Sequence, residues 1–468
     1  MTAVSPDSYP LLERHDPATI VAYRHGRAIA TPEFLDDVAR SVHAMEAAAA
    51  GRHVLNTCAD RYCFAVGFAA ILVSGRISLL PSTLTQETID RLQEFAPDAV
   101  QFTDSAVGTL GLPCIAYPEA GPDGVMVRGP SGDATALPIP RIASEALAAY
   151  VFTSGSTGIP VPHRKQWGRL AECVRAEGSI LGFREARRHA ILGTVPPQHM
   201  YGFESTVLAA LQSGVAFSAA RPLYPADICA ELSALPEPRV LVTTPFHLRT
   251  LLDAGIDVPA LALILSATAP LSPGLAREAE SRCNAPLIEI YGSTETGQIA
   301  SRRTVEGAAW KLFPGVRLAP ENGRHRASGG HVEGEVPIDD VLELFDDGRF
   351  LLHGRSADMV NIAGKRSSIG YLNHQLCAVP GVQDGAFALP DGETPDGVTR
   401  LIAAVVAPGL DQAHLVRALR ERIDAAFMPR RIVFVERLPR NATGKLPAAA
   451  LLALFATGRS PDPDVKPD

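Results

Sequence analysis

The chain has 468 residues, of which 46% are hydrophobic and 20% are charged, a composition typical of a globular protein with two or three domains. Its formal net charge is −8 and it contains no block of Lys or Arg, which argues against nucleic acid as a partner. The seven cysteines show no C-x-x-C spacing. Neither a zinc site nor a disulfide framework is therefore expected, and a reducing cytoplasm fits best.

No segment of the sequence reads as a membrane anchor. Residues 1–16 lack a basic stretch followed by an apolar one, so no secretory signal is expected. The most apolar stretch, Tyr62–Ser74, is shorter than the roughly 20 residues that a membrane-spanning helix needs. We predict a buried core helix there, no membrane span and a cytoplasmic location.

Helix-like and strand-like segments alternate from the N-terminus to Gly292. Helices are predicted at 33–50, 62–74, 87–95, 167–181, 205–214, 247–255 and 275–283. Strands are predicted at 53–58, 77–81, 98–103, 146–152, 189–195, 215–220, 239–245, 261–268 and 286–292. This alternation predicts a layered α/β fold with largely parallel sheets.

The pattern changes after Gly292 to short β segments, including a hairpin over 342–354 with a turn at Asp347-Gly348. Beyond it, helices are predicted at 371–379 and 414–427, and strands at 385–390, 401–408 and 431–436. We predict a large α/β N-terminal domain with a trimmed β subdomain, residues 1–354. A small, mobile α+β C-terminal domain is predicted over residues 355–468.

The segment Thr153–Gly158, TSGSTG, follows a predicted strand and combines two glycines with four hydroxyl side chains. Such a loop exposes backbone N–H groups and short hydroxyl donors, which suits a polyphosphate. It is not a Walker P-loop, because Ile159 rather than Lys follows the last glycine. These residues alone are equally compatible with a phosphate loop and with an ordinary turn.

A second loop, YGSTETG at Tyr291–Gly297, also follows a predicted strand. It places the Thr294 hydroxyl beside the Glu295 carboxylate. A hydroxyl that binds phosphate and a carboxylate that binds Mg²⁺ are used together in phosphoryl chemistry. The alternative is the start of a helix, with Thr294 as N-cap and Glu295 near the positive end of the helix dipole.

Two further segments carry basic residues. Gly354–Arg366 lies at the predicted domain joint, and Leu438–Leu446, LPRNATGKL, presents Lys445 after a Thr-Gly turn. Taken alone, Lys445 reads as a solvated surface charge.

Together and in this order, the four motifs resemble the core motifs of the adenylate-forming superfamily, which includes acyl- and aryl-CoA ligases, luciferases and the adenylation domains of peptide synthetases. The resemblance extends from the predicted helix at Tyr62 to Lys445. It implies an enzyme that uses ATP and Mg²⁺ to convert a carboxylic acid to acyl-AMP with release of pyrophosphate. The acyl group then passes to the thiol of CoA or of an acyl carrier protein.

The resemblance implies that the TSGSTG loop holds the ATP phosphates. The positions carried over are Thr153, Ser154, Gly155, Ser156, Thr157 and Gly158.

It also implies roles in catalysis. Thr294 contacts the α-phosphate and Glu295 binds Mg²⁺. Lys445 bridges the attacking carboxylate and the α-phosphate, where negative charge builds in the transition state. His199, in PPQHMYG, lines the acid pocket and gates the thiol tunnel.

Five more positions match nucleotide-binding motifs of the superfamily. Ala267 and Thr268, in SATAP, stand where the superfamily has a wall between substrate and adenine, and Tyr291 opens the YGSTE motif. Asp340 matches the ribose-binding aspartate. Arg355 opens the hinge motif and is also expected to reach the ribose.

The residues that the resemblance places around the acid are His199, Tyr201, Phe203, Ser266, Thr268 and Gly292. The alternative role for these residues is ordinary core packing. For Phe203 the sequence is equally compatible with core packing and with substrate contact. No basic anchor is evident for the far end of this pocket, so a dicarboxylate is not expected.

The chain departs from the superfamily pattern at several positions. Val161 stands where a lysine usually follows the loop proline, and Lys165 lies nearby. Ile338-Asp339 replaces the usual Thr-Gly before Asp340, and Ala357 stands in the hinge motif where aspartate or lysine is usual.

The compact length resembles that of stand-alone ligases of bacterial aryl-polyene and pigment pathways, which favours a small aromatic acid. A medium-chain fatty acid–CoA ligase is one alternative, and a non-catalytic nucleotide-binding homologue acting as a regulator is another. Retention of both Glu295 and Lys445 favours an active enzyme.

Overall fold

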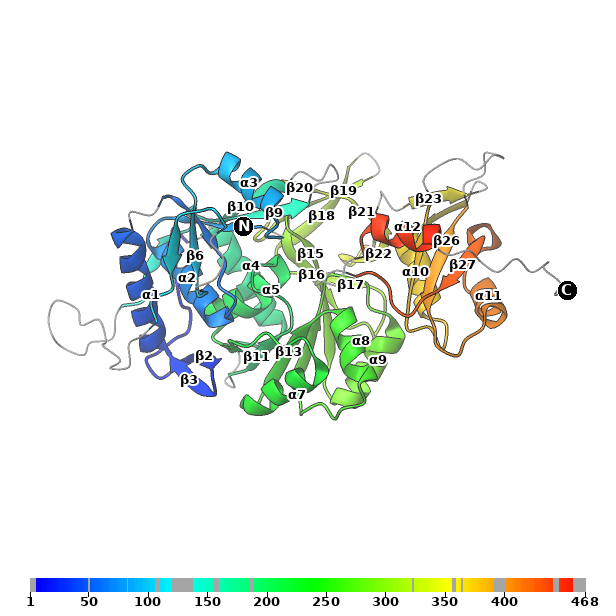
Figure 1. Ribbon diagram of the computed structural model, residues 1–468, viewed down its shortest axis with the longest axis horizontal. Coiled ribbons are helices and arrows are strands. Elements are labelled where there is room, and N and C mark those ends of the chain that lie inside the picture. The colour runs from blue at the N-terminus through cyan, green and yellow to red at the C-terminus, as the bar shows by residue number, and fades with distance from the viewer. Residues whose placement is uncertain are drawn as a thin grey trace.

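The computed structural model describes residues 6–48, 51–81, 83–105, 110–119, 138–154, 160–184, 188–321, 324–355, 359–362, 365–390, 400–440 and 446–457. Two large sheets with their helices form the N-terminal part, and a smaller α/β unit lies beside it (Figure 1). The predicted fold class, a large layered α/β domain followed by a small α+β domain, is confirmed.

The first large sheet has six strands and is mostly parallel. In spatial order they are β10 (Pro160–Gln166), β9 (Leu147–Ser154), β5 (Ile77–Leu80), β4 (His53–Asn56), β6 (Val100–Thr103) and β7 (Cys114–Ala116). The exception is the antiparallel hairpin of β9 and β10 at its edge. The TSGSTG loop connects these two strands, and its residues 155–159 lie outside the described residues.

The second large sheet has eleven strands. In spatial order they are β21 (Asp340–Leu344), β22 (Arg349–Arg355), β17 (Trp310–Leu312), β16 (Gly297–Arg302), β15 (Leu287–Ser293), β14 (Leu263–Ser266), β13 (Arg239–Thr243), β11 (Ala190–Gly193), β12 (Ala216–Ser218), β2 (Ile20–Arg24) and β3 (Arg27–Ala30). The six strands from β15 to β2 are parallel to one another. Their carboxyl ends therefore meet at one edge, where α/β proteins build their sites.

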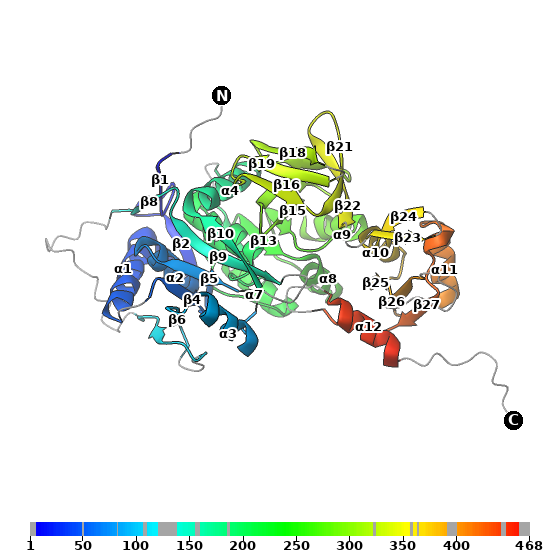
Figure 2. The same ribbon diagram turned by 90° about the horizontal axis from the view of Figure 1, so that it is seen from above.

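These central strands form where the sequence is apolar on both faces. Every residue of β14, LILS, is buried, because helices or the other sheet cover both sides. The helices of this part are α1 (Thr31–Ala47), α2 (Arg61–Val73), α3 (Gln86–Phe95), α4 (Trp167–Ile180), α5 (Met200–Gly202), the π-helical turn η1 (Phe203–Leu208), α6 (Ala209–Ser213), α7 (Pro225–Ala234), α8 (Pro245–Asp253) and α9 (Pro273–Cys283). Figure 2 shows them spread over both sheets.

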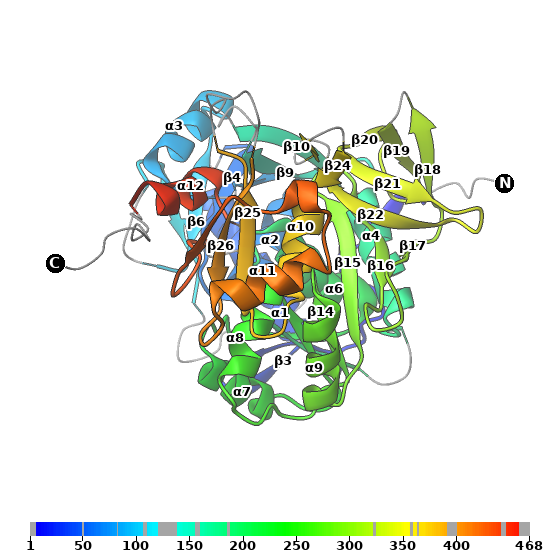
Figure 3. The ribbon, with the colours of Figure 1, turned by 90° about the vertical axis from the view of Figure 1, so that its right-hand side faces the viewer.

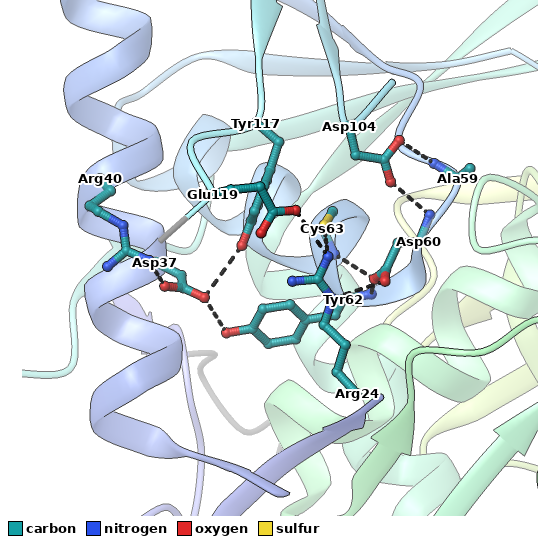
Figure 4. Close-up of polar contacts among 10 residues, drawn as sticks. All are labelled: Arg24, Asp37, Arg40, Ala59, Asp60, Tyr62, Cys63, Asp104, Tyr117 and Glu119. Carbon is teal, nitrogen blue, oxygen red and sulfur yellow. Dashed lines mark hydrogen bonds and ion pairs between the residues drawn. The ribbon is translucent and has the colours of Figure 1, made fainter. Parts of the chain in front are cut away.

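Helix α2 is the buried core helix that the apolar stretch at 62–74 predicts. All but its last residue are buried. Its start is fixed by Asp60, whose carboxylate accepts hydrogen bonds from the backbone N–H groups of Tyr62 (2.7 Å) and Cys63 (3.1 Å). The same carboxylate pairs with Arg24 Nε at 2.9 Å. Figure 4 shows this cap together with the Asp37 carboxylate, to which the Tyr62 hydroxyl donates at 2.7 Å.

Smaller β elements complete the N-terminal part. A two-stranded sheet pairs β1 (Ser8–Pro10) with β8 (Arg141–Ala143), and a three-stranded sheet contains β18 (Val316–Glu321), β19 (Arg324–Gly329) and β20 (Glu335–Ile338). The predicted hairpin turn is present between β21 and β22. Gly348 occupies it with φ of +80°, a conformation that glycine adopts without strain.

The C-terminal unit packs helices against a short three-stranded sheet (Figure 3). Its elements are β23 (Met359–Ile362), β24 (Lys365–Ser368), α10 (Ile369–Cys377), β25 (Asp384–Ala388), β26 (Ile402–Val406), α11 (Gln412–Arg420), the 3-10 turn η3 (Ala425–Phe427), β27 (Arg431–Phe434) and α12 (Ala448–Thr457). The predicted helix 414–427 is too long. The chain leaves the helix after Arg420, and Asp424 caps η3 instead.

Among the helices that the structure describes, none combines the length and the apolar character needed to cross a membrane.

Candidate active site

The hairpin of β9 and β10 brings the phosphate-loop strand next to the YGSTE motif. The Thr153 hydroxyl of β9 lies 2.9 Å from His163 Nε2 on β10. The same ring nitrogen lies 3.3 Å from Glu295 Oε1. Burial lowers the pKa of His163, which favours the neutral ring at pH 7. Two motifs that are far apart in the sequence thus meet through one histidine.

Lys165 does not occupy the place of the lysine that the superfamily has at position 161. Val161 and Lys165 lie on the same face of β10, but four residues of strand separate them by about 13 Å. Val161 is exposed next to the loop, whereas Lys165 is buried and its ammonium donates to the backbone oxygen of Glu295 at 3.3 Å. His163 is the basic side chain on this face that lies nearer to the loop.

The YGSTE motif forms a turn between β15 and β16, and no helix follows it. The backbone N–H of Ser293 donates to Thr296 Oγ1 at 3.1 Å, and the N–H of Thr296 donates to Ser293 Oγ at 3.2 Å. The helix-cap alternative for Thr294 is therefore wrong. Within the described part of the chain the Thr294 hydroxyl makes no hydrogen bond, so it is available to a ligand.

Glu295 is held in its ionised form. Burial alone would raise the pKa of this carboxyl, but hydrogen bonds from its own backbone and from Ser293, with the nearby positive charge of Lys165, lower the pKa overall. An ionised carboxylate with a side chain 40% exposed is suited to binding a divalent cation.

Gly292 is required by the backbone of this turn. A Cβ atom there would lie 2.1 Å from the backbone oxygen of Gly297, because a bulge after Tyr291 brings β15 and β16 close together. Gly292 was predicted to line the acid pocket. The close approach of the two strands explains why glycine is needed at this position, whether or not a substrate contacts it.

The predicted ribose residues lie close to one another. The Tyr291 hydroxyl donates to Asp340 Oδ2 at 2.6 Å, and the Tyr291 ring packs against Trp310 and Phe350 with ring centroids 5.6 Å away in each case. The backbone of Asp340 lies opposite that of Arg355 in the antiparallel hairpin of β21 and β22. The residue predicted for the hinge and the residue predicted for the ribose are thus neighbours in one β-ladder.

The SATAP segment leaves β14 with two buried hydroxyl groups. Ser266 Oγ and Thr268 Oγ1 have no hydrogen-bond partner among the described residues. Thr268 has φ of +79°, which is strained for a β-branched residue and is typical of functional sites. Ala267 between them is buried. Both hydroxyls are buried without a partner among the described residues, and their place in the wall beside the adenine stays a prediction.

The PPQHMYG segment separates into two environments. His199 directly precedes α5 and is half-buried. Phe203 is fully buried and its ring packs against Phe68 of α2 with centroids 4.8 Å apart, so the core interpretation that the sequence left open holds for Phe203. Tyr201 is also buried, and burial raises the pKa of its hydroxyl.

Several predicted positions have no described side chain. Lys445 and the loop residues Gly155, Ser156, Thr157 and Gly158 lie outside the described residues. Ser154 and Arg355 belong to described strands by their backbone only. Their roles stay predictions.

Arg61 is a buried cation that the sequence analysis missed. From the capped start of α2 its guanidinium donates to the backbone oxygens of Gly193 (2.9 Å) and Val195 (2.7 Å). Gly193 ends β11 and Val195 lies two residues beyond it, just before the segment that carries His199. Gln198 of that segment donates to the Cys58 oxygen at 2.9 Å, so α2 and its preceding turn hold the segment in place.

A buried polar network lies behind the site, between α4, η1 and β16. The Ser205 hydroxyl donates to Glu177 Oε1 at 2.7 Å, and Gln298 Nε2 donates to Ser205 Oγ at 2.9 Å. Burial raises the pKa of Glu177 to about 8 and that of Glu204 to about 7. A glutamate within an apolar helical stretch, such as Glu204 in FESTVLAAL, was the only sequence signal for this network.

Replacement of Glu177 with glutamine is expected to change how stability depends on pH. The folded-state pKa of about 8 lies above the ordinary value of 4.5, so the wild-type protein loses stability as pH rises from about 4.5 to about 8. Glu177→Gln removes this loss. At about 1.4 kcal/mol per pKa unit, the unfolding free energy of the variant relative to wild type should rise by roughly several kcal/mol over that range.

Urea unfolding at pH 5 and at pH 8.5 measures this difference. The exposed Glu46 of α1 offers a control, since Glu46→Gln should change the unfolding free energy by the same amount at pH 5 and at pH 8.5. Parallel pH profiles of Glu177→Gln and wild type would show that Glu177 is ionised in the folded state throughout.

Comparison with known proteins agrees with these motifs. Residues 38–336 match the sequence pattern of the AMP-binding enzymes, and residues 374–445 match that of the AMP-binding enzyme C-terminal domain.

Similar proteins include CoA ligases. The chain is 30% identical to the 4-coumarate–CoA ligase of Rhodobacter capsulatus over 306 residues, which cover 64% of this chain and 75% of that protein. It is 26% identical to the 3-hydroxybenzoate–CoA/4-hydroxybenzoate–CoA ligase of Thauera aromatica over 360 residues, 67% of this chain and 68% of that one.

Solved structures share the fold over nearly the whole chain. The o-succinylbenzoate–CoA synthetase of Bacillus subtilis, in complex with its acyl-adenylate intermediate, gives a TM-score of 0.78 at 18% identity and covers 97% of this chain and 99% of that one. ATP-bound MatB from Rhodopseudomonas palustris gives 0.77 at 20% identity, with coverage of 94% and 97%. From the matched sequence patterns, as the four motifs predict, the chain belongs to the AMP-binding enzymes of the adenylate-forming superfamily.

Proposed function

We propose that this chain is an AMP-forming ligase that activates an aromatic carboxylic acid with ATP and transfers the acyl group to the thiol of CoA. The observation that carries the proposal is the meeting of Thr153, His163 and Glu295 at one edge of the fold, beside Thr294. The relatives named for 4-coumarate and for hydroxybenzoates support the choice of an aromatic acid.

The residues of the site suit Mg²⁺ and ATP. Glu295 is ionised and partly exposed, and the hydroxyls of Ser266 and Thr268 have no partner among the described residues. Mg²⁺ bound at Glu295 would offset the negative charge of the phosphate oxygens.

The chemistry needs these residue types because both reactants are anions. Lys445 and the hydroxyl loop would reduce the repulsion between the acid carboxylate and the α-phosphate and hold the two in line. The Tyr291–Asp340 pair would fix the ribose, so that the α-phosphate meets Thr294. The thiol step needs little more, since a thiolate is already a good nucleophile.

We place the reaction in a reducing cytoplasm. All seven cysteines are free thiols, which suits such a compartment. An acyl carrier protein is the alternative thiol, and comparison of CoA with a pantetheinylated carrier protein in the thioester assay would separate the two.

The test is pyrophosphate release from ATP and Mg²⁺ across a panel of benzoic, cinnamic and medium-chain fatty acids. We expect release with an aromatic acid and formation of its CoA thioester. Release with fatty acids alone would replace the aromatic assignment by the fatty-acid one. Background release with every acid, in a sample that binds ATP, would favour the regulatory homologue that the Val161 and Ala357 departures permit.

A further inference from the structure

One buried glutamate, Glu289 of β15, holds both ends of the SATAP loop, residues 266–270. Its backbone stands opposite that of Ser266 in the parallel ladder of β14 and β15, where the loop begins. Its carboxylate accepts a hydrogen bond from the backbone N–H of Leu271 at 3.3 Å, where the loop ends. The Glu289 side chain is only 4% exposed. The SATAP loop is therefore closed on a single residue of the neighbouring strand.

The loop that Glu289 closes has a strained backbone. Thr268, in its middle, has φ of +79°, a value that is costly for a β-branched residue. Such a conformation persists only where the surrounding structure fixes the chain. The hydroxyls of Ser266 and Thr268 are buried and have no partner among the described residues. A costly conformation together with unsatisfied polar groups is typical of a segment that binds a ligand.

The same carboxylate connects the loop to β16 and to the segment that follows it. Glu289 Oε2 pairs with Arg302 Nε at 2.6 Å and also accepts from the Thr304 hydroxyl. The Arg302 guanidinium lies over the Trp310 ring, 4.4 Å from its centroid, and donates to the Ala308 oxygen at 3.1 Å. These contacts hold the guanidinium in one orientation between the carboxylate and the indole ring.

Trp310 extends the connection to the residues predicted to bind the ribose. Its ring packs against that of Tyr291 with centroids 5.6 Å apart. The Tyr291 hydroxyl donates to Asp340 Oδ2 at 2.6 Å. A continuous series of side-chain contacts therefore leads from the Glu289 carboxylate to the Tyr291–Asp340 pair.

We propose that Glu289 is a positioning residue for the adenosine half of ATP. It keeps the SATAP loop in its strained conformation and, through Arg302 and Trp310, fixes this loop relative to the Tyr291–Asp340 pair. The inference rests on the proposed ligase function, in which these two segments contact the adenine and the ribose, and deepens it. Glu289 acts through other residues, because its carboxylate oxygens are already bonded within the protein.

Glu280 of α9 offers a matched control. Its carboxylate accepts from the backbone N–H of Leu287 at 2.8 Å and pairs with Arg303 at 2.7 Å, and its side chain is 14% exposed. Glu280 thus makes the same two kinds of contact as Glu289. Leu287 is the first residue of β15, so these contacts lie at the amino end of the strand, away from the edge where the carboxyl ends meet.

The test measures the two halves of ATP separately, because AMP carries the adenosine and pyrophosphate does not. We would determine the dissociation constants of AMP and of magnesium pyrophosphate by calorimetry. Glu289→Gln should weaken AMP binding by about tenfold, since hydrogen bonds to a charged group are lost, and should leave pyrophosphate binding unchanged. Glu280→Gln should leave both constants unchanged. In turnover by Glu289→Gln, the KM for ATP should rise more than kcat falls.

Melting curves establish that each variant is folded, and both glutamine variants should melt earlier than wild type. Arg302→Lys carries the same test should Glu289→Gln not fold. Lysine keeps a positive charge beside Glu289 but has no planar group to lie over Trp310. Arg302→Lys should therefore weaken AMP binding by about threefold and leave pyrophosphate binding unchanged.

Three results would overturn the inference and leave the ligase function intact. They are an AMP affinity unchanged in both Glu289→Gln and Arg302→Lys, equal losses of AMP and pyrophosphate affinity, and the same loss of AMP affinity in Glu280→Gln. A wild-type protein that binds AMP but releases no pyrophosphate with any acid would refute the ligase function, while the AMP constants would still decide the role of Glu289. Absence of AMP binding by the wild-type protein would refute both.

Discussion

Replacement of Lys445 with alanine should abolish acyl-adenylate formation while largely sparing the thioester step. A preorganised charge at the α-phosphate contributes about 10²–10³-fold to a rate, and the adenylation rate should fall by that factor. Thioester formation from a pre-made acyl-adenylate should change little. By resemblance to the superfamily, the small domain that carries Lys445 rotates away before the thiol arrives.

Both half-reactions of the Lys445→Ala variant must be measured, the first as pyrophosphate release and the second as CoA thioester formed from synthetic acyl-adenylate. Lys311 of β17 supplies the control, because Lys311→Ala removes an exposed lysine and should leave both rates unchanged. Equal losses in the two half-reactions would mean that Lys445 supports the structure generally. The model in which the C-terminal domain rotates between the two half-reactions should then be dropped.

Glu295→Gln should lower the rate of adenylation by about 10³-fold with little loss of stability. A metal carboxylate provides several kcal/mol of charge stabilisation in the transition state, and each 1.4 kcal/mol corresponds to a factor of ten. The folded protein depends on this side chain far less. It is 40% exposed and its Oε1 lies 3.3 Å from Nε2 of the neutral His163 ring, a kind of contact that contributes about 1 kcal/mol or less.

The measurement is the dependence of pyrophosphate release on Mg²⁺ concentration, together with the melting temperature. His163→Gln is the control, since it removes the contact between the His163 ring and Glu295 and keeps the carboxylate. It should affect the apparent Mg²⁺ affinity much less than Glu295→Gln does. A Glu295→Gln variant that melts early but retains its rate would contradict the metal assignment.

Some parts of the fold could be predicted because their physics is local. The apolar runs at 239–245 and 261–268 predicted β13 and β14, since a strand buried on both faces has to be apolar throughout. Helix α12 was not predicted. Its sequence, AAALLALFAT, is apolar all round and has no helical period to read.

The motifs of the site could be predicted, but their surroundings could not. TSGSTG and YGSTE were recognised by their local sequence, whereas the contact of His163 with Glu295 depends on how β10 packs beside the β15–β16 turn. The buried network joins Glu177, Ser205 and Gln298, which no local pattern connects. The packing of α4 against η1 and β16 brings these three residues together.

The backbone pairing of Asp340 with Arg355 in the β21–β22 hairpin also limits where the C-terminal unit can rotate relative to the N-terminal part. The last backbone pair of the hairpin holds residue 355 to the strand that bears Asp340, the residue predicted to bind the ribose. A rotation of the C-terminal unit would then have its hinge in the chain that follows residue 355. The predicted contact of Asp340 with the nucleotide would then stay with the N-terminal part. An acyl-adenylate formed in the first orientation could therefore stay bound while the C-terminal unit rotates, removes Lys445 from the site and admits the thiol.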